Sequence, residues 1–277
     1  MKIVTLLENT KSELSDLRVV HGLSIYVETN EKKLLFDVGP DDSFARNASI
    51  LGVNIEEVDC LIISHAHKDH CGGLETFFKL NNRAKVYIHS GVRGEFFSRR
   101  FGEMRSIGPD LELLENYKER IVFIDKKTKV YPFMTLIMTS VHNTFVPKDN
   151  ENIFIKKHGK IVLDDFAHEL IMVVEENDVL QVFTACSHSG IINMVLSVEK
   201  EFPGRKIETL VGGFHLMNPH KDGMLEEESI VVGLAKTLIE HRVEKVFTGH
   251  CTGQEAYGVL KSVLGGRLEK LYTGSRY

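Results

Sequence analysis

The chain has few cysteines, no long apolar run and no excess of basic residues. Its 277 residues include only four cysteines, Cys60, Cys71, Cys186 and Cys251, which are too few and too scattered for the disulfide framework of a secreted protein. Its apolar runs fall far short of the roughly 18 residues that a membrane helix needs. The amino end shows neither a long apolar core nor a small-residue cleavage site, and is typical of a first strand. We therefore predict a cytoplasmic protein with no membrane partner.

The charge balance argues against a nucleic-acid partner. The formal net charge is -5, whereas phosphate backbones are bound by patches of lysine and arginine. Only Arg99 and Arg100, which lie among aromatic residues in 96–101, form a local basic cluster. The favoured interpretation is a solvated helix face with two buried aromatics. The alternative is that these arginines bind an anionic small molecule.

Linkers and repeats are also missing. No Pro/Gly/Ser-rich stretch, low-complexity tract or short-period repeat interrupts the chain, and α/β chains of this length often form one domain. We therefore predict a single domain over residues 1–277.

Strand-like and helix-like patterns alternate along most of the chain. The first part predicts strands at 2–8, 22–28, 33–38, 58–64 and 85–89, with helices at 43–52 and 74–80. The middle part, 91–160, predicts a helix around 110–118 and strands at 121–124, 135–141 and 153–155. The last part predicts strands at 170–175, 179–185, 208–214 and 245–249, and helices at 190–202, 226–241 and from Gln254.

This order of elements predicts a mixed α and β fold, α/β or α+β. Three consecutive strands come first, and strands then alternate with helices. Two mixed β-sheets packed face to face with helices outside, a four-layer αββα sandwich, would satisfy this order. Sites in such folds usually form where strands end.

A histidine-rich run follows one of these strands directly. His65, His67, Asp69 and His70 fall within six residues, after the apolar strand and before Gly72-Gly73. In an extended loop, residues two apart project to the same side, so the side chains of His65 and His67 can bind the same metal ion. Imidazole nitrogens and carboxylate oxygens are donors that zinc accepts. The alternative, a solvated loop that happens to be rich in histidine, does not explain this position.

The run resembles the His-x-His-x-Asp-His signature of the metallo-β-lactamase superfamily, and 36–39, with Asp37, resembles the strand end that precedes the signature there. The resemblance implies the metallo-β-lactamase fold. It also implies that His65 and His67 bind one metal with a further histidine, and that Asp69 and His70 bind a second metal. His250, in the sequence Phe-Thr-Gly-His, resembles the last ligand of the second metal.

Further motifs resemble the dihydropteroate-synthase-like branch of that superfamily, which is named for a pterin–ribofuranosylaminobenzene phosphate synthase. The similarity extends over most of the chain. Its carriers are His21-Gly22-Leu23-Ser24, Asn47-Ala48, Leu51-Gly52-Val53, Asp164-Asp165, Cys186-Ser187-His188-Ser189-Gly190, Gly212-Gly213-Phe214-His215-Leu216 and His250-Cys251-Thr252-Gly253.

Three residues compete to complete the first metal site. His188 is preferred because it follows an apolar strand and precedes a helix; a buried, satisfied histidine is the alternative reading. Cys186 lies where some superfamily members carry a metal-binding cysteine or a bridging aspartate. Asp165 lies where other branches have a histidine, and there this chain departs from the family pattern. Asp37, Cys186 and Asp165 are thus expected beside the metals or as ligands.

His215 and His21 are candidates to face the substrate, and a structural role is the alternative for both. We assign His215, with Asp69, to catalysis. The glycine pairs Gly72-Gly73 and Gly212-Gly213 are interpreted as room for close backbone approach. The remaining histidines are expected in surface or packing roles: His89, His142, His158, His168, His220 and His241.

Two divalent transition-metal ions, zinc by preference and iron or manganese as alternatives, would lower the pKa of a bound water toward about 7 and supply hydroxide at neutral pH. Asp69 could orient that water. We therefore predict a metal-dependent hydrolase that acts on a small ester or phosphoester. The alternative implied by the resemblance is a synthase that releases pyrophosphate from a pterin, with Arg99 and Arg100 on phosphates. A noncatalytic metal-binding protein is a third reading, although structural zinc sites are usually cysteine-rich.

Overall fold

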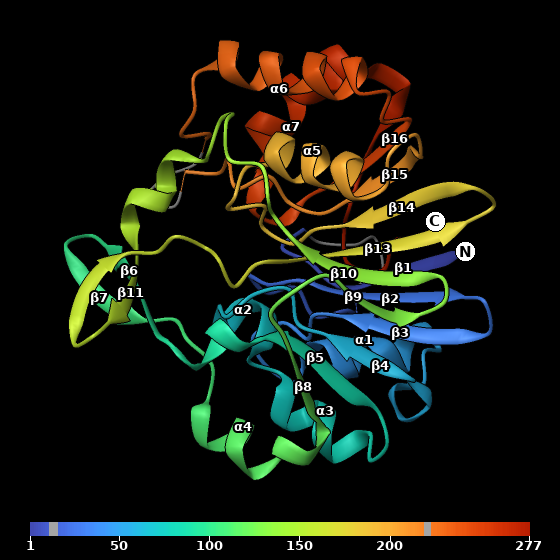
Figure 1. Ribbon diagram of the computed structural model, residues 1–277, viewed down its shortest axis with the longest axis vertical. Coiled ribbons are helices and arrows are strands. Elements are labelled where there is room, and N and C mark those ends of the chain that lie inside the picture. Colours follow the sequence, from blue (N-terminus) through green and yellow to red (C-terminus); the bar gives the residue numbers. More distant parts are fainter. Residues whose placement is uncertain (11–15, 219–222) are drawn as a thin grey trace. The chain divides into compact units, whose positions relative to one another are not determined.

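The strands of the computed structural model gather into two large mixed sheets and one small sheet (Figure 1). The structure describes residues 1–10, 16–218 and 223–277. These residues form two compact units. Unit 1 comprises Met1–Glu95, Ile107–Asp125 and Leu271–Tyr277, and unit 2 comprises Phe96–Ser106 and Lys126–Lys270.

Unit 1 is built on a six-stranded sheet in the order β1-β2-β3-β4-β5-β8. Strands β1 to β3 pair antiparallel, and β3, β4, β5 and β8 pair parallel. The strands are β1 (Lys2–Leu7), β2 (Ser24–Thr29), β3 (Lys32–Phe36), β4 (Cys60–Ile62), β5 (Lys85–His89) and β8 (Ile121–Ile124). The helices are α1 (Ser43–Leu51), α2 (Lys68–Cys71), α3 (Leu74–Leu80) and α4 (Leu111–Asn116).

Strands β1, β2 and β4 of this sheet are nearly continuous runs of buried residues, as expected for strands covered on both faces. In β1 every residue after Lys2 is buried, and β4 is buried throughout. Helix α1 packs against β1 and buries Phe44, Ala48 and Leu51 on one face. At the edge of the sheet, the last residues of the chain pair with the first strand, where Ile3 and Tyr277 exchange backbone hydrogen bonds of 2.9 and 3.0 Å.

Unit 2 contains a seven-stranded sheet in the order β17-β16-β15-β14-β13-β10-β9. Its strands from β14 to β17 are parallel, and the others pair antiparallel. They are β9 (Thr128–Tyr131), β10 (Met134–Met138), β13 (Leu170–Glu176), β14 (Val179–Phe183), β15 (Lys206–Val211), β16 (Lys245–Thr248) and β17 (Leu268–Lys270).

Helices α5 (Ile191–Glu201), α6 (Glu228–Glu240) and α7 (Gln254–Leu264) lie together on one side of this sheet (Figure 1). Their apolar faces and the facing strand residues form one buried cluster. The cluster includes Val195 of α5, Leu234 of α6 and Leu260 of α7. Such burial is the main source of stability for helices of this length.

The small sheet of unit 2 has the strand order β12-β11-β6-β7. Its strands are β6 (Glu95–Arg100), β7 (Glu103–Ser106), β11 (Ile153–Lys157) and β12 (Lys160–Leu163). The sequence did not predict this sheet. The expectation that Arg99 and Arg100 lie on a helix is wrong, because 96–100 alternates with a period of two: Phe96 and Ser98 are buried and Arg99 is exposed.

Both large sheets are mixed, as the order of elements predicted, and helices α1, α3 and α5 to α7 occur where the periodicity placed them. Among the described residues, no helix combines the length and the apolar character that a bilayer crossing demands. All four cysteines are buried free thiols.

Candidate metal centre

In unit 1, the histidine run begins in the loop after β4, at the carboxyl end of a buried parallel strand, and ends in the short helix α2, which carries Asp69 and His70. His65, His67 and His70 have at most 4% of their surface exposed. The glycines that follow make room for the loop: a Cβ on Gly73 would lie 2.3 Å from the carbonyl oxygen of Val38, and one on Gly72 would lie 2.3 Å from that of Pro40. The interpretation of this pair as room for close backbone approach is confirmed.

Asp37 organises the loop from the end of β3. Its buried carboxylate accepts three hydrogen bonds of 2.7 Å, from the backbone N–H of Ser64, from Ser64 Oγ and from His70 Nδ1. Because the Ser64 hydroxyl donates to Asp37, it accepts from His65 Nδ1, which lies 2.9 Å away. Both histidines therefore hold a proton on Nδ1, and their neutral rings carry the lone pair on Nε2, as in carboxylate–histidine–metal triads.

The spacing of the two leading histidines fits a shared metal ion. His65 Nε2 lies 3.1 Å from His67 Nδ1. Two nitrogens bound tetrahedrally at about 2.0–2.1 Å from zinc would be about 3.3 Å apart. The ring centroids of His65 and His70 are 4.2 Å apart, so the three rings form one compact buried set. The donor types and their spacing fit a divalent transition metal.

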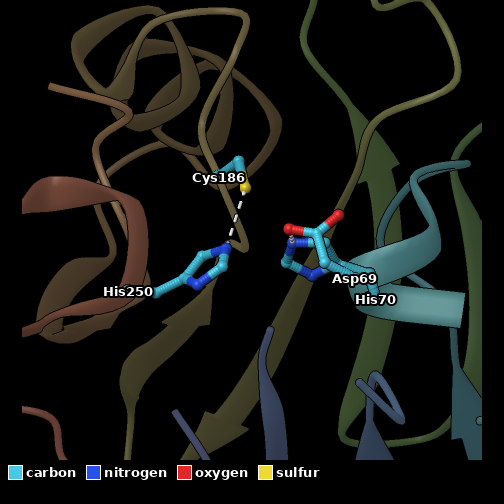
Figure 2. A group of neighbouring side chains, drawn as sticks. All are labelled: Asp69, His70, Cys186 and His250. Atoms are coloured by element: carbon cyan, nitrogen blue, oxygen red, sulfur yellow. Dashed lines mark hydrogen bonds and ion pairs between the residues drawn. The ribbon is translucent and has the colours of Figure 1, made fainter. Parts of the chain in front are cut away.

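Asp69 lies beside this set and is more exposed, with 23% of its side chain accessible. Its carboxylate is 3.4 Å from His70 Nε2, and Figure 2 shows it next to the His70 ring. His21 approaches Asp69 from its exposed side, at 3.3 Å. Although burial alone lowers the pKa of His70, the charges of Asp69 and Asp37 raise it to about 10. The raised pKa favours a second proton on Nε2 in the metal-free ring, and a metal ion bound at Nε2 would displace that proton.

In unit 2, Cys186 and His188 lie in the loop between β14 and α5, and both are buried. The buried carboxylate of Glu169 accepts the backbone N–H groups of His188 and Ser189, each at 2.9 Å. Burial raises the pKa of Glu169. The ring of Phe166 stacks on that of His188, with centroids 4.3 Å apart. Glu169 thus holds the backbone of this loop, and Phe166 packs against one face of the His188 ring.

His250 follows β16 and contacts the same loop. Figure 2 shows its Nε2 atom directed at Cys186 Sγ, 3.4 Å away. The neighbouring Cys251 thiol accepts the backbone N–H of His215 at 3.3 Å. Although burial raises the pKa of Cys251, its contacts with Cys186, His250 and His215 lower it well below the ordinary thiol value. A Cβ on Gly213 would meet Cys251 Sγ at 2.5 Å, so this glycine also makes room for close approach.

His215 lies in the loop after β15, with its ring centroid 4.1 Å from that of His188. Its Nε2 is 3.5 Å from the carboxylate of Asp149. Burial alone lowers the pKa of His215, but Asp149 and Cys251 raise it to about 9. His188, His215 and His250, predicted from three separate strand ends, thus lie around one end of the seven-stranded sheet.

Four of these residues have backbone angles that side chains rarely adopt. The φ angles are 61° at Asp37, 58° at Ser187, 53° at His215 and 50° at His250. A left-handed conformation of a non-glycine residue costs free energy and persists where the surroundings impose it, most often at functional sites. These four strained residues lie in the segments that follow β3, β14, β15 and β16 and carry or support candidate ligands.

Three other predicted residues make contacts with residues other than these histidines. Asp165 is half-exposed and pairs with Lys157 at 2.6 Å. Arg99 extends over the ring of Phe154, with 5.2 Å between guanidinium and centroid. Arg100 donates to the carboxylate of Asp149 with its two terminal guanidinium nitrogens, at 3.1 and 2.8 Å.

Sequence reasoning missed several residues around the candidate ligands. Asp149 and Asn150, in the short helix η4 (Lys148–Asn152), carried no motif. Glu169 could have been found as an acid directly before a buried strand. His168, expected only in a surface or packing role, is buried and lies 3.1 Å from Asp164. Of the other histidines, His241 pairs with Glu199, and His220 lies outside the described residues.

Comparison with known proteins agrees with this architecture. The sequence profile of the metallo-beta-lactamase superfamily matches residues 17–176, and the chain belongs to this superfamily. A metal-dependent hydrolase of the beta-lactamase superfamily, Tm1679, is similar over 100% of this chain and 98% of its own, with a TM-score of 0.83 and 28% identity. The chain therefore has the metallo-β-lactamase fold that the sequence predicted.

The branch predicted from the motifs is also supported. The 7,8-dihydropterin-6-methyl-4-(beta-D-ribofuranosyl)-aminobenzene-5'-phosphate synthase of Methanocaldococcus jannaschii is 28% identical, over 99% of this chain and 95% of its own length. The zinc-bound PqqB of Methylobacterium extorquens is 11% identical with a TM-score of 0.59, a likeness of fold alone.

Proposed function

We propose that this protein is a metal-dependent hydrolase of a small ester or phosphoester, with two divalent ions, zinc by preference. The observation that carries the proposal is the Asp37 network, which orients His65 and His70 so that both carry their lone pair on Nε2. A buried carboxylate that sets histidine tautomers is typical of metal centres. The proposed ligands are His65, His67, Asp69 and His70 of unit 1 with His188 and His250 of unit 2.

The bound ions would supply Lewis acidity and a water of lowered pKa. The protein contributes orientation and proton transfer. Asp69 accepts a hydrogen bond from the attacking water and directs it to the substrate. His215, whose pKa is raised to about 9, donates a proton to the leaving oxygen.

The substrate is proposed to be a small anionic molecule, since Arg99 is exposed on β6 and can bind an anion. We also propose that the protein works in the cytoplasm, in keeping with its four buried free thiols.

A second function is favoured by the similarity over nearly the whole chain to the synthase of M. jannaschii. In that reaction class, an aminobenzene carbon or nitrogen attacks a pterin methyl carbon, pyrophosphate leaves with the electron pair of the broken C–O bond, and the attacking atom then loses a proton. The same centre would bind the pyrophosphate, and Arg99 would contact its oxygens.

One comparison separates the two functions. Purified protein loaded with zinc is assayed for hydrolysis of activated esters and phosphodiesters, and for pyrophosphate release from a pterin pyrophosphate with an aminobenzene acceptor. Hydrolysis that chelation abolishes and that rises with pH supports the first proposal. Pyrophosphate release that requires the acceptor supports the second. Activity that is unchanged by chelation would refute both.

A further inference from the structure

The short helix η4 carries two adjacent side chains that each contact a histidine of unit 2. Asn150 contacts His188, and Asp149 contacts His215. The segment lies in the chain between β10 of the seven-stranded sheet and β11 of the small sheet, where the sequence holds no recognised motif. Its contacts determine which nitrogen of the His188 ring holds the proton.

The two hydrogen bonds of Asn150 determine the tautomer of His188. Asn150 Nδ2 donates to the backbone carbonyl of His188 at 2.9 Å. The amide oxygen is therefore the atom that faces the ring, 3.1 Å from Nδ1. An amide oxygen only accepts, so Nδ1 must hold the proton and Nε2 the lone pair. Phe166, stacked at 4.3 Å and nearly parallel to the ring at 6°, defines the plane of the imidazole.

Asp149 is held equally firmly. Arg100 donates to both of its oxygens, and Asn152 Nδ2 donates to Oδ1 at 3.0 Å. The carboxylate, with 2% of its side chain exposed, then faces His215 Nε2 at 3.5 Å. A planar bidentate pair fixes direction as well as charge. Arg100 thus acts on Asp149 within unit 2.

The helix itself is anchored at its start. The backbone N–H of Lys148 donates to Glu226 Oε1 at 2.8 Å, and the Glu226 side chain is fully buried. Pro147 precedes it and limits the backbone at the entry. The two contacts with the histidines are therefore made from a supported backbone.

We propose that η4 is a positioning segment: Asn150 sets the tautomer and direction of His188, and Asp149 holds the ring of His215. The metal-binding consequence rests on the proposed function, whereas the tautomer is a property of the chain itself. Groups that orient a ligand from outside change metal affinity by about 10–100-fold when removed. We expect that range for Asn150.

The test is nitrogen NMR of the full chain with 15N-labelled histidine, after treatment with chelator, combined with zinc titration. The His188 signals are assigned with a His188→Gln variant. In wild type we expect the proton on Nδ1. Asn150→Leu should shift the ring toward the other tautomer and lower zinc affinity about 10–100-fold. Asn150→Asp retains an oxygen acceptor that faces Nδ1 of His188, so this variant should have the wild-type tautomer and a zinc affinity close to that of wild type.

Asn152→Leu is the matched control, because Asn152 lies in the same helix, is also half-buried and contacts Asp149 but is recorded in no contact with His188. Asn152→Leu should keep the His188 tautomer and the zinc affinity of wild type.

Asp149→Asn should move the His215 signals while His188 keeps its proton on Nδ1. A proton on Nε2 of His188 in wild type, or unchanged signals in Asn150→Leu, would overturn the proposal. Wild type that binds no zinc would refute the proposed function but leave the NMR result decisive for η4.

Discussion

At the scale of single residues, two of the proposed ligands of unit 1, His65 and His70, depend on one buried carboxylate. Asp37 accepts three donors at 2.7 Å, and no neutral residue can replace all of these contacts. In an asparagine, one of the two terminal atoms becomes a donor and would face either an N–H or an O–H group. The tautomers of His65 and His70 are then no longer imposed.

We predict that Asp37→Asn lowers zinc affinity by about 10–100-fold and the free energy of unfolding by about 1–3 kcal/mol. Isothermal titration and urea unfolding measure the two effects. Asp59→Asn is the control, since Asp59 also accepts a backbone N–H, from Lys33 at 2.9 Å, and has no recorded contact with a histidine. Equal zinc affinity in Asp37→Asn and wild type would contradict the prediction.

The assignment of the doubtful ligand is also tested by single residues. We predict that His188→Ala empties one metal site, because a direct donor is lost. Cys186→Ser and Asp165→Asn should keep most of the metal; Asp165 is half-exposed and pairs with Lys157. Metal titration decides the matter. Two ions in His188→Ala, together with the loss of one ion in either other variant, would show that the ligand is misassigned.

The contribution of the Asp149 carboxylate to folding stability depends on pH. Although burial raises the pKa of Asp149, its contact with the His215 ring at 3.5 Å and the charge of Arg100 lower it below the ordinary value. In the unfolded chain the pKa is about 3.9, so the stabilisation is fully present above that pH and is lost as the pH falls through the lower folded value.

Asp149→Asn should therefore be less stable than wild type by about 1–3 kcal/mol at pH 7, and the difference should shrink below about pH 4. Urea unfolding at pH 7 and at pH 3 measures both values. A difference that is as large at pH 3 as at pH 7 would argue against an ionised Asp149 in the folded protein.

At the scale of elements, the loop from β14 to α5 carries the proposed ligand His188, and the glycine at its end permits the path of the backbone. Gly190 has a φ of 89°, and a Cβ there would lie 2.1 Å from the carbonyl oxygen of Phe145. The glycine comes directly before α5 and two residues after His188. Both the backbone conformation and the close approach exclude a side chain.

We predict that Gly190→Ala costs more than about 2 kcal/mol in the free energy of unfolding and weakens zinc binding. Gly204→Ala is the matched control: Gly204 has a φ of 77°, but a Cβ there would meet nothing within 4 Å, so only the backbone strain of about 1–2 kcal/mol remains. Thermal unfolding and zinc titration compare the two. Equal losses of stability would show that the approach to Phe145 is unimportant.

At the scale of the whole molecule, the proposed ligands come from both units, and ion binding adds to folding stability. We predict up to two transition-metal ions per chain, and one calorimetric unfolding transition in the zinc-loaded protein, as expected for a single domain over 1–277. The His65→Ala/His67→Ala double variant should hold less metal and melt at a lower temperature. Plasma emission after exhaustive dialysis measures the metal. Equal content in variant and wild type would refute the metal centre.

The sequence by itself predicted most of the elements of the two large sheets and the first half of the candidate site. The strand ends and the run from His65 to His70 are local patterns, because hydrophobic periodicity and ligand spacing are written along the chain. The resemblance carried by these motifs then predicted the superfamily, which the family profile confirms.

Only the tertiary structure decided which side chains surround those ligands. Asp149, Asn150 and Glu169 are distant in sequence from the histidines or backbone groups that they contact, so no spacing rule connects them. The small sheet escaped prediction because its strands β6 and β11 are neighbours in space and separated by 52 residues between Arg100 and Ile153. The orientation of Asn150, and with it the proton of His188, depends on two hydrogen bonds that exist only after folding.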